Sequence, residues 1–147
     1  MRVDISTEIV IDRPVSVVST YAADPDNAPK WYVNIKSVEW KTPRPLTVGS
    51  RVAFVAQFLG HRMAYTYEIV EVRPVERLVM RTAEGPFPME TQYLWSVDPS
   101  GGTRMILRNR GTPIGFSRCV APFIARAMKR ANKKDLLLLK QLLEQTA

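Results

Sequence analysis

The 147-residue chain has little that usually marks a catalytic or metal site. It contains one cysteine, Cys119, and one histidine, His61, so it holds no internal disulfide framework. A zinc site would need carboxylates for its other ligands, and no spacing of acids suggests one. The sequence also lacks a glycine-rich phosphate loop and a nucleophile elbow. We therefore predict no metal and no cofactor, and the catalytic residues, if there are any, stay unassigned.

Long apolar runs are missing as well. No stretch approaches the length of a membrane span. The opening segment, MRVDISTEIVID, alternates apolar and polar residues and so indicates a strand instead of the apolar core of a signal peptide. With 46% apolar and 24% charged residues, residues 1–147 are expected to form one domain with its own core, located in the cytoplasm.

Acidic residues are scarce in the C-terminal third. Residues 1–98 hold 11 basic and 12 acidic residues, a net charge of −1, whereas residues 99–147 hold 10 basic and two acidic, a net charge of +8. Such asymmetry is typical of a solvated helix face, or of a surface that binds RNA, an anionic membrane or an acidic carrier protein. The basic face predicted for that role consists of Arg104, Arg108, Arg110, Arg126, Lys129, Arg130 and Lys133.

Hydrophobic periodicity predicts an α+β fold. A strand at the start is followed by two short helices, about six consecutive strands and one long helix from about residue 117 to residue 145, whose apolar residues recur at helical spacing. Consecutive antiparallel strands bury one face, and the long helix is available to cover it. We expect a curved antiparallel sheet wrapped around the C-terminal helix.

A curved sheet that grips one helix need not fill its interior, and small-molecule sites are concave, largely apolar and furnished with a few polar groups. Alternation places several hydroxyl and amide side chains on the inner face, where each needs a partner in the protein, in water or in a ligand. For Asn109, a bond to local backbone is the alternative to ligand contact. The predicted ligand-binding residues are Trp31, Phe54, Phe58, Tyr65, Tyr67, Met80, Met89, Thr91, Tyr93, Trp95, Asn109, Phe123, Ile124 and Met128.

Four segments resemble a known superfamily. They are RPVSVVSTYAADPDNAPKWYVNIKSVEW, YEIVEVRPVERLVMR, the GPFPMETQYLWSV and GGTRMIL pair, and PFIARAMKRANKKDLLLLKQLLE. Together they resemble START-like proteins (SRPBCC, or Bet v 1-like) with the helix-grip fold, in particular the polyketide cyclase/dehydrase and lipid-transfer proteins. The resemblance implies a ligand cavity between the sheet and the C-terminal helix, with Trp31 and Tyr32 either capping it or plugging that end of the domain.

Three functions remain open from the sequence. The first is binding of an apolar small molecule such as a lipid, a polyketide or a quinone-like ring compound. The second is an aromatase/cyclase or dehydratase, in which Tyr65, Tyr67 and Asn109 position and polarise a carbonyl-bearing substrate, since cyclisation relies largely on holding a reactive chain in one conformation. The third is an interaction module that uses the basic face.

Overall fold

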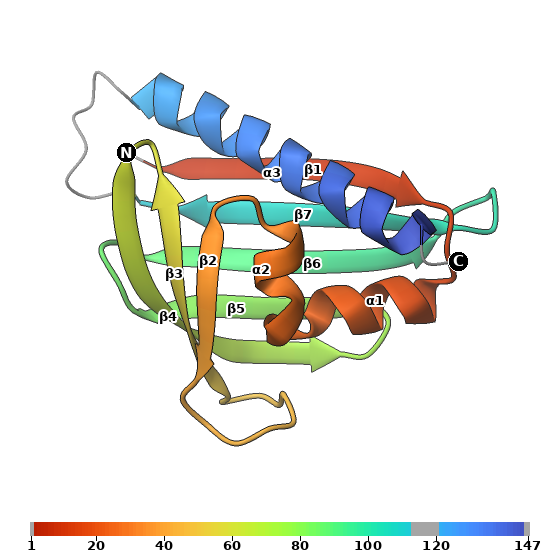
Figure 1. Cartoon of the computed structure of the whole chain (residues 1–147), viewed down its shortest axis with the longest axis horizontal. Coiled ribbons are helices and arrows are strands. Elements are labelled where there is room, and N and C mark those ends of the chain that lie inside the picture. Colours follow the sequence, from red (N-terminus) through yellow and green to blue (C-terminus); the bar gives the residue numbers. More distant parts are fainter. Residues whose placement is uncertain (1, 113–120, 146–147) are drawn as a thin grey trace.

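The computed structural model describes residues 2–112 and 121–145 (Figure 1). The predicted element order is confirmed, with the predicted strands forming a single seven-stranded sheet. The elements are β1 Val3–Ile11, α1 Val15–Ala23, the 3-10 helix η1 Pro25–Asn27, α2 Ala28–Trp31, β2 Ile35–Trp40, β3 Arg51–Phe58, β4 His61–Arg73, β5 Arg77–Glu84, β6 Met89–Val97, β7 Thr103–Gly111 and α3 Ala121–Gln145.

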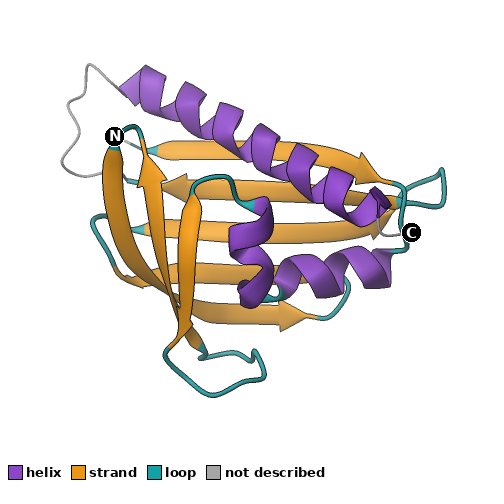
Figure 2. Cartoon of the chain, viewed as in Figure 1, coloured by secondary structure: helices purple, strands orange, loops and turns teal. Residues whose placement is uncertain are grey.

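All neighbouring strands of the sheet are antiparallel, in the order β1-β7-β6-β5-β4-β3-β2. Six of the strands follow one another along the chain, whereas β1 pairs with β7, so that Val3 lies opposite Gly111. The sheet curls around one side of the molecule, and α3 runs across that side with α1 and α2 beside one end of it (Figures 1 and 2). This is the helix-grip arrangement that the sequence predicted.

The first strand and first helix form for reasons visible in the sequence. In β1, Val3, Ile5 and Ile11 are buried while the residues beside them are exposed or half-buried, which is the period of two that gave the prediction. Pro14 precedes the first turn of α1, where its missing N–H leaves no bond unmade. Asp24 ends α1, and its carboxylate accepts a hydrogen bond from the backbone N–H of Asp26 at 3.0 Å.

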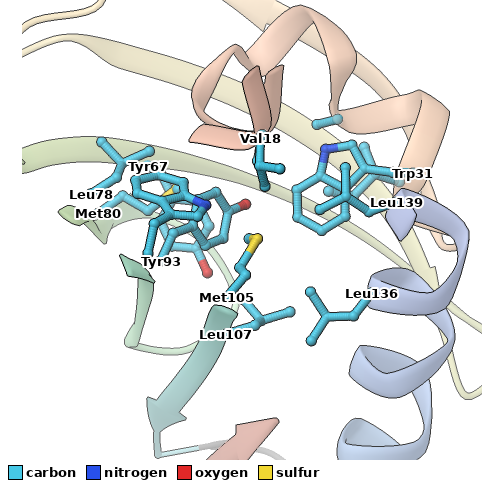
Figure 3. Packing of buried hydrophobic residues seen from close by; sticks show 14 of the residues in the cluster. Val18, Trp31, Tyr67, Leu78, Met80, Tyr93, Met105, Leu107, Leu136 and Leu139 are labelled. Carbon is cyan, nitrogen blue, oxygen red and sulfur yellow. The ribbon is translucent and has the colours of Figure 1, made fainter. Parts of the chain in front are cut away.

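The core lies between α3 and the inner face of the sheet. Leu136 and Leu139 of α3 face Met105 and Leu107 of β7, and all four side chains are almost fully buried (Figure 3). Because β7 alternates, Arg104, Arg108 and the other even-numbered residues lie on the convex face of the sheet. The sheet therefore has an apolar inner side and a charged outer side.

The β3–β4 connection is a tight turn, and β4 begins at His61 directly after it. Leu59 and Gly60 make the turn with positive φ values of 51° and 78°, which is the two-residue geometry whose twist matches that of a hairpin.

Of the helices in the described ranges, none is long and apolar enough to cross a membrane.

Candidate functional site

A cavity of about 160 Å³ lies between the inner face of the sheet, α2 and α3. Since a water needs about 10 to 15 Å³ of such space, the cavity has room for on the order of ten waters, or for a ligand about as large as one aromatic ring. Its wall is mostly apolar. The predicted residues that line it are Phe54, Phe58, Tyr65, Tyr67, Met80, Met89, Thr91, Tyr93, Asn109, Ile124 and Met128.

Three polar side chains from the inner face of the sheet form a hydrogen-bonded relay on this wall. The Thr91 hydroxyl donates to Oδ1 of Asn109 at 2.6 Å, and the hydroxyls of Tyr67 and Thr91 are 2.9 Å apart. The Thr91 hydroxyl has one hydrogen, and it is already donated to Asn109. Tyr67 is therefore the donor in its bond to Thr91. The amide Nδ2 of Asn109 has no hydrogen-bond partner among residues 2–112 and 121–145, so a donor remains at the end of the relay.

A second pair of hydroxyls lies farther along the same wall. The phenol oxygens of Tyr32 and Tyr93 are 2.6 Å apart, and the ring of Tyr32 stacks on Trp31 with centroids 4.1 Å apart. Burial raises the pKa of Tyr32 and Tyr65 well above the usual value. It also raises the pKa of Tyr67 to about 12, although the hydrogen bond to Thr91 acts to lower it. These phenols are therefore neutral at ordinary pH and act as hydrogen-bond donors or acceptors.

Asp135 of α3 brings a carboxyl group to the cavity. The side chain is only 3% exposed, and its Oδ1 accepts a hydrogen bond from the backbone N–H of Val33 at 2.9 Å. Burial raises the pKa of Asp135 to about 7, with the Val33 hydrogen bond opposing the shift. A carboxyl group with this pKa can donate or accept a proton near neutral pH, which an exposed aspartate does rarely.

Asn132 lies one turn before Asp135 on α3. Its amide Nδ2 is buried and makes no hydrogen bond within the part of the chain that the structure describes. A buried donor without a partner costs about 1–3 kcal/mol. Together, Asn132 and Asn109 place unsatisfied donors on two sides of an apolar cavity, an arrangement suited to holding the oxygen of a small molecule or ordered water.

Three predicted ligand-binding residues are placed elsewhere. The inward-facing residues of α3 include Ile124, Met128 and Asp135. Phe123 precedes Ile124 by one residue, so its side chain points about 100° away around the helix axis and is 64% exposed. Its predicted inward position is wrong. Trp31 is fully buried against Tyr32 and Tyr93 and packs in the core beside Leu139, so it does not line this cavity (Figure 3).

Trp95 is also absent from the cavity wall. It lies on the inner face of β6, but two residues beyond Tyr93 and toward α1, where it lines a different hollow. Its indole Nε1 is buried and has no hydrogen-bond partner within residues 2–112 and 121–145. The alternation correctly gave the face of the sheet for Trp95, but not its position along the strand relative to the helices.

The predicted single basic face is wrong in its geometry. Its three strand arginines lie on the convex side of the sheet and are paired with acids. Arg104 pairs with Glu8 and Asp98. Arg108 pairs with Asp4, and Arg110 pairs with Glu90. Four basic residues in the first half of α3 are exposed, and no ion pair joins these four to another described residue, whereas Lys140 near the end of the helix pairs with Glu144. Those side chains, which we call the α3 basic patch, are Arg126, Lys129, Arg130 and Lys133.

Other candidate chemistry is not assembled in the structure. His61 is exposed at the start of β4 and does not line the cavity. Within the described ranges, no group of three or more His, Cys, Asp or Glu side chains could hold a metal ion. Cys119 lies outside the described residues.

The sequence analysis did not single out Asp135 or Asn132, and it considered Tyr32 only as a cap or plug. The missed signal is a polar interruption of an apolar stripe. Leu136, Leu139 and Leu143 continue the buried face of α3, and Asn132 and Asp135 fall on that face at helical spacing. A buried polar residue on such a face needs a partner or a function.

Solved structures share this fold. A protein from Thermus thermophilus superposes with a TM-score of 0.84 at 19% identity, covering 98% of this chain and 99% of that one. For a START superfamily protein from Mycobacterium smegmatis, the TM-score is 0.83 at 11% identity, with 98% and 99% covered. The Zhui aromatase/cyclase from a Streptomyces species gives 0.80 at 14% identity, with 99% and 95% covered.

Because the sequence identities to these structures are low, the structural similarity shows a shared fold and does not show a shared activity. No curated protein matches the sequence. A sequence family does match, however, and it extends over nearly the whole chain, from residue 2 to residue 144. The chain therefore belongs to the family described as "Polyketide cyclase / dehydrase and lipid transport", as its resemblance to START-like proteins indicated.

Proposed function

We propose that the protein binds a small apolar molecule that carries a hydroxyl or carbonyl oxygen, with the molecule's body in the cavity between the sheet and α3. The observation that carries this proposal is the buried Nδ2 of Asn132, a hydrogen-bond donor without a protein partner in the described chain, on the wall of an apolar cavity. Asn109 supplies a second donor across the cavity. An oxygen atom of the ligand would satisfy either of them.

The lining supports a flat or flexible apolar body. Phe54, Met80 and Met89 offer polarizable and aromatic surface, and sulfur-containing side chains adapt to ligands of different shape. The family description includes both cyclases and lipid transport. A quinone-like ring, or one end of a lipid or polyketide, fits a cavity of this size. The low cysteine content of the chain supports a cytoplasmic location for this activity.

Native mass spectrometry of the purified protein, followed by organic extraction, tests the proposal. We expect a retained apolar molecule that is lost in Asn132→Leu and in Asn109→Leu, because both remove a donor at similar volume. Gln57→Leu, on the exposed side of β3, is the matched control and should retain the molecule. Retention by all three variants, or no binding of any apolar probe to the wild type, would contradict the proposal.

A cyclase or dehydratase is the second candidate, and Asp135 is the observation that favours it. A carboxyl group with a pKa of about 7 beside neutral phenols could accept a proton from a carbon next to a carbonyl group and return it to a leaving oxygen. The phenols would hold the carbonyl oxygen meanwhile. We expect Asp135→Asn to keep binding of a carbonyl-bearing chain but to abolish its cyclisation, as measured by product analysis; unchanged turnover would exclude this role.

The α3 basic patch favours a third activity, binding to an anionic membrane surface. Arg126, Lys129 and Lys133 lie on the same helix as Phe123, whose exposed ring is available to enter the headgroup region. Vesicles with and without anionic lipid give the test. We expect binding that needs anionic lipid, weakens with salt and falls on Lys129→Gln with Lys133→Gln. Equal affinity for RNA or an acidic carrier protein would instead support those partners.

A further inference from the structure

A second hollow adjoins the cavity on the side of α1. It has a volume of about 470 Å³. Its walls come from α1, from residues 41–50 between β2 and β3, from the β4–β5 turn and from the inner face of the sheet at Leu78 and Trp95. We call it the outer cleft.

The cavity and the outer cleft share part of their walls. Ala23, Asp24, Pro25, Leu46 and Leu78 line both. Two hollows with five wall residues in common lie back to back, separated by the thickness of these side chains. A ligand too long for the cavity therefore has space available directly behind this shared wall.

Leu46 is the member of the wall that can move most easily. Leu78 is almost fully buried on β5, and Ala23 and Pro25 belong to α1 and η1. Leu46 is half-buried and lies in the irregular segment between β2 and β3, outside the ladder of strand hydrogen bonds. A change in its rotamer breaks no backbone hydrogen bond of the sheet.

The segment that carries Leu46 is anchored next to it. The Asp26 carboxylate accepts hydrogen bonds from the guanidinium of Arg44, the shortest at 2.9 Å, and from Nε1 of Trp40, also at 2.9 Å. The guanidinium of Arg44 lies 4.8 Å from the centre of the Trp40 ring. These contacts hold the rim of the outer cleft in place, so that the Leu46 side chain can move while its backbone stays.

The outer cleft can accept an apolar chain. Trp40, Val72, Pro74 and Trp95 give it apolar and aromatic surface. The buried Nε1 of Trp95 also has no partner in the described residues, so a second oxygen at the far end of a long ligand could accept its hydrogen. Polar groups at both ends and an apolar middle describe an elongated molecule.

We infer that Leu46 sets the length of ligand that the protein accepts: its side chain closes the cavity toward the outer cleft, and its displacement lets an alkyl chain extend from one into the other. This inference rests on the proposed function. It assigns the oxygen-bearing end of the ligand to the cavity, beside Asn132 and Asn109, and the tail to the outer cleft.

Straight-chain alkanols of increasing length are suitable probes, with dissociation constants measured by displacement of a fluorescent dye. Each buried methylene group should tighten binding about fourfold until the available space is filled, after which affinity levels off. Leu46→Ala should move this break to longer alkanols, and Leu46→Trp should move it to shorter ones. Val48→Ala, exposed on the same segment and lining neither hollow, should leave it unchanged.

The outcomes separate the two proposals. A break at the same chain length in wild type, Leu46→Ala and Leu46→Trp, with tight binding in all three, would overturn the role of Leu46 while leaving the proposed function intact. Failure of every alkanol to bind the wild type would overturn both. A thermal melt of each variant checks that it is folded, and Leu46→Met, which nearly conserves volume, should keep the wild-type break.

Discussion

Glu90 and Asp135 are buried acids on opposite sides of one sheet, and their pKa values move in opposite directions. Glu90, on the convex side, is 7% exposed, and Asp135, at the cavity, is 3% exposed. Burial alone would raise the pKa of Glu90, but hydrogen bonds from Arg110, Arg81 and Gln92 outweigh it and lower the pKa to about 2. Asp135 has only the Val33 N–H to oppose its burial, and its pKa rises to about 7.

The difference shows that the partners of a buried carboxylate, more than its depth, decide whether it is ionised. On the convex side, Arg81 donates to Oε1 of Glu90 at 2.9 Å, and Arg110 and Gln92 donate to Oε2. Every oxygen is satisfied and the group is held in its charged form, which suits a structural role. At the cavity, the second oxygen of Asp135 has no partner in residues 2–112 and 121–145, which suits contact with a ligand.

Asp135→Asn should have the largest effect on stability. The pKa of Asp135 is raised from 3.8 to about 7, so its stabilising contribution is complete below pH 3.8 and is lost as pH rises through about 7. Asn cannot ionise and still accepts from Val33. We expect the variant to be more stable than wild type by about 2 to 4 kcal/mol at about pH 8, with little difference at about pH 4.

Urea denaturation at both pH values measures this effect, with Glu84→Gln on the exposed end of β5 as a control that should follow the wild type. If Asp135→Asn keeps the decline in stability between the two pH values, the carboxyl group is already ionised in the folded protein. The comparison with Glu90 would then fail.

Glu90→Gln should act in the opposite direction. The pKa of Glu90 is lowered from 4.5 to about 2, so its contribution is present above pH 4.5 and is lost as pH falls through about 2. The variant leaves Arg110 and Arg81 without their carboxylate, and we expect it to lose about 2 kcal/mol at neutral pH. Unfolding at neutral pH and at about pH 3 should show the difference shrinking in acid; a constant difference would mean that lost packing is the cause.

Tyr67→Phe sharpens the comparison on the inner side. It removes the hydrogen bond to Thr91 while leaving the bond from Thr91 to Asn109 in place, so we expect a loss of about 1 kcal/mol. Tyr65→Phe is the matched variant, since no hydrogen bond joins the Tyr65 hydroxyl to another described residue. Thermal melts of the two should differ; equal losses would indicate that the relay contributes nothing to stability.

Arg108→Ala should have the smallest effect. Arg108 donates to both carboxylate oxygens of Asp4 at 2.9 and 2.7 Å, but this pair is exposed on the convex side. Exposed pairs contribute about 0.5 kcal/mol, and salt screens them. We expect a small loss in urea denaturation at low salt that disappears at high salt. A loss as large as that of Glu90→Gln would show that the whole convex side acts as one network.

The fold was accessible from the sequence because its signals are local. Alternation in β1 and β6, Pro14 before α1 and the apolar stripe of α3 each specify an element within one window of the chain. The inner face of the sheet follows from the same alternation. Strand residues of the cavity wall, such as Tyr67 and Asn109, were therefore predictable, whereas the wall supplied by α1, η1 and Leu46 was not.

The parts that were missed depend on distant residues. Arg104 and Arg108 look like a free basic stripe until β1 is paired with β7, which brings Glu8 and Asp4 to them across about a hundred positions of sequence. Phe123 looked like part of the apolar face because helical spacing alone does not fix where that face is centred. Asp135 was passed over because its environment comes from α2, the sheet and the residues around Val33.

The pairing of β1 with β7 also bears on how the chain is made. During synthesis Val3 leaves the ribosome long before Gly111, its partner in the sheet. At about 5 to 20 residues per second, β1 waits on the order of 5 to 20 seconds with its apolar side uncovered. Its exposed charges, Asp4 and Glu8 among them, then keep the nascent strand from pairing with other chains. We therefore expect the acids that later pair with Arg104 and Arg108 to act first against aggregation of the unpaired strand.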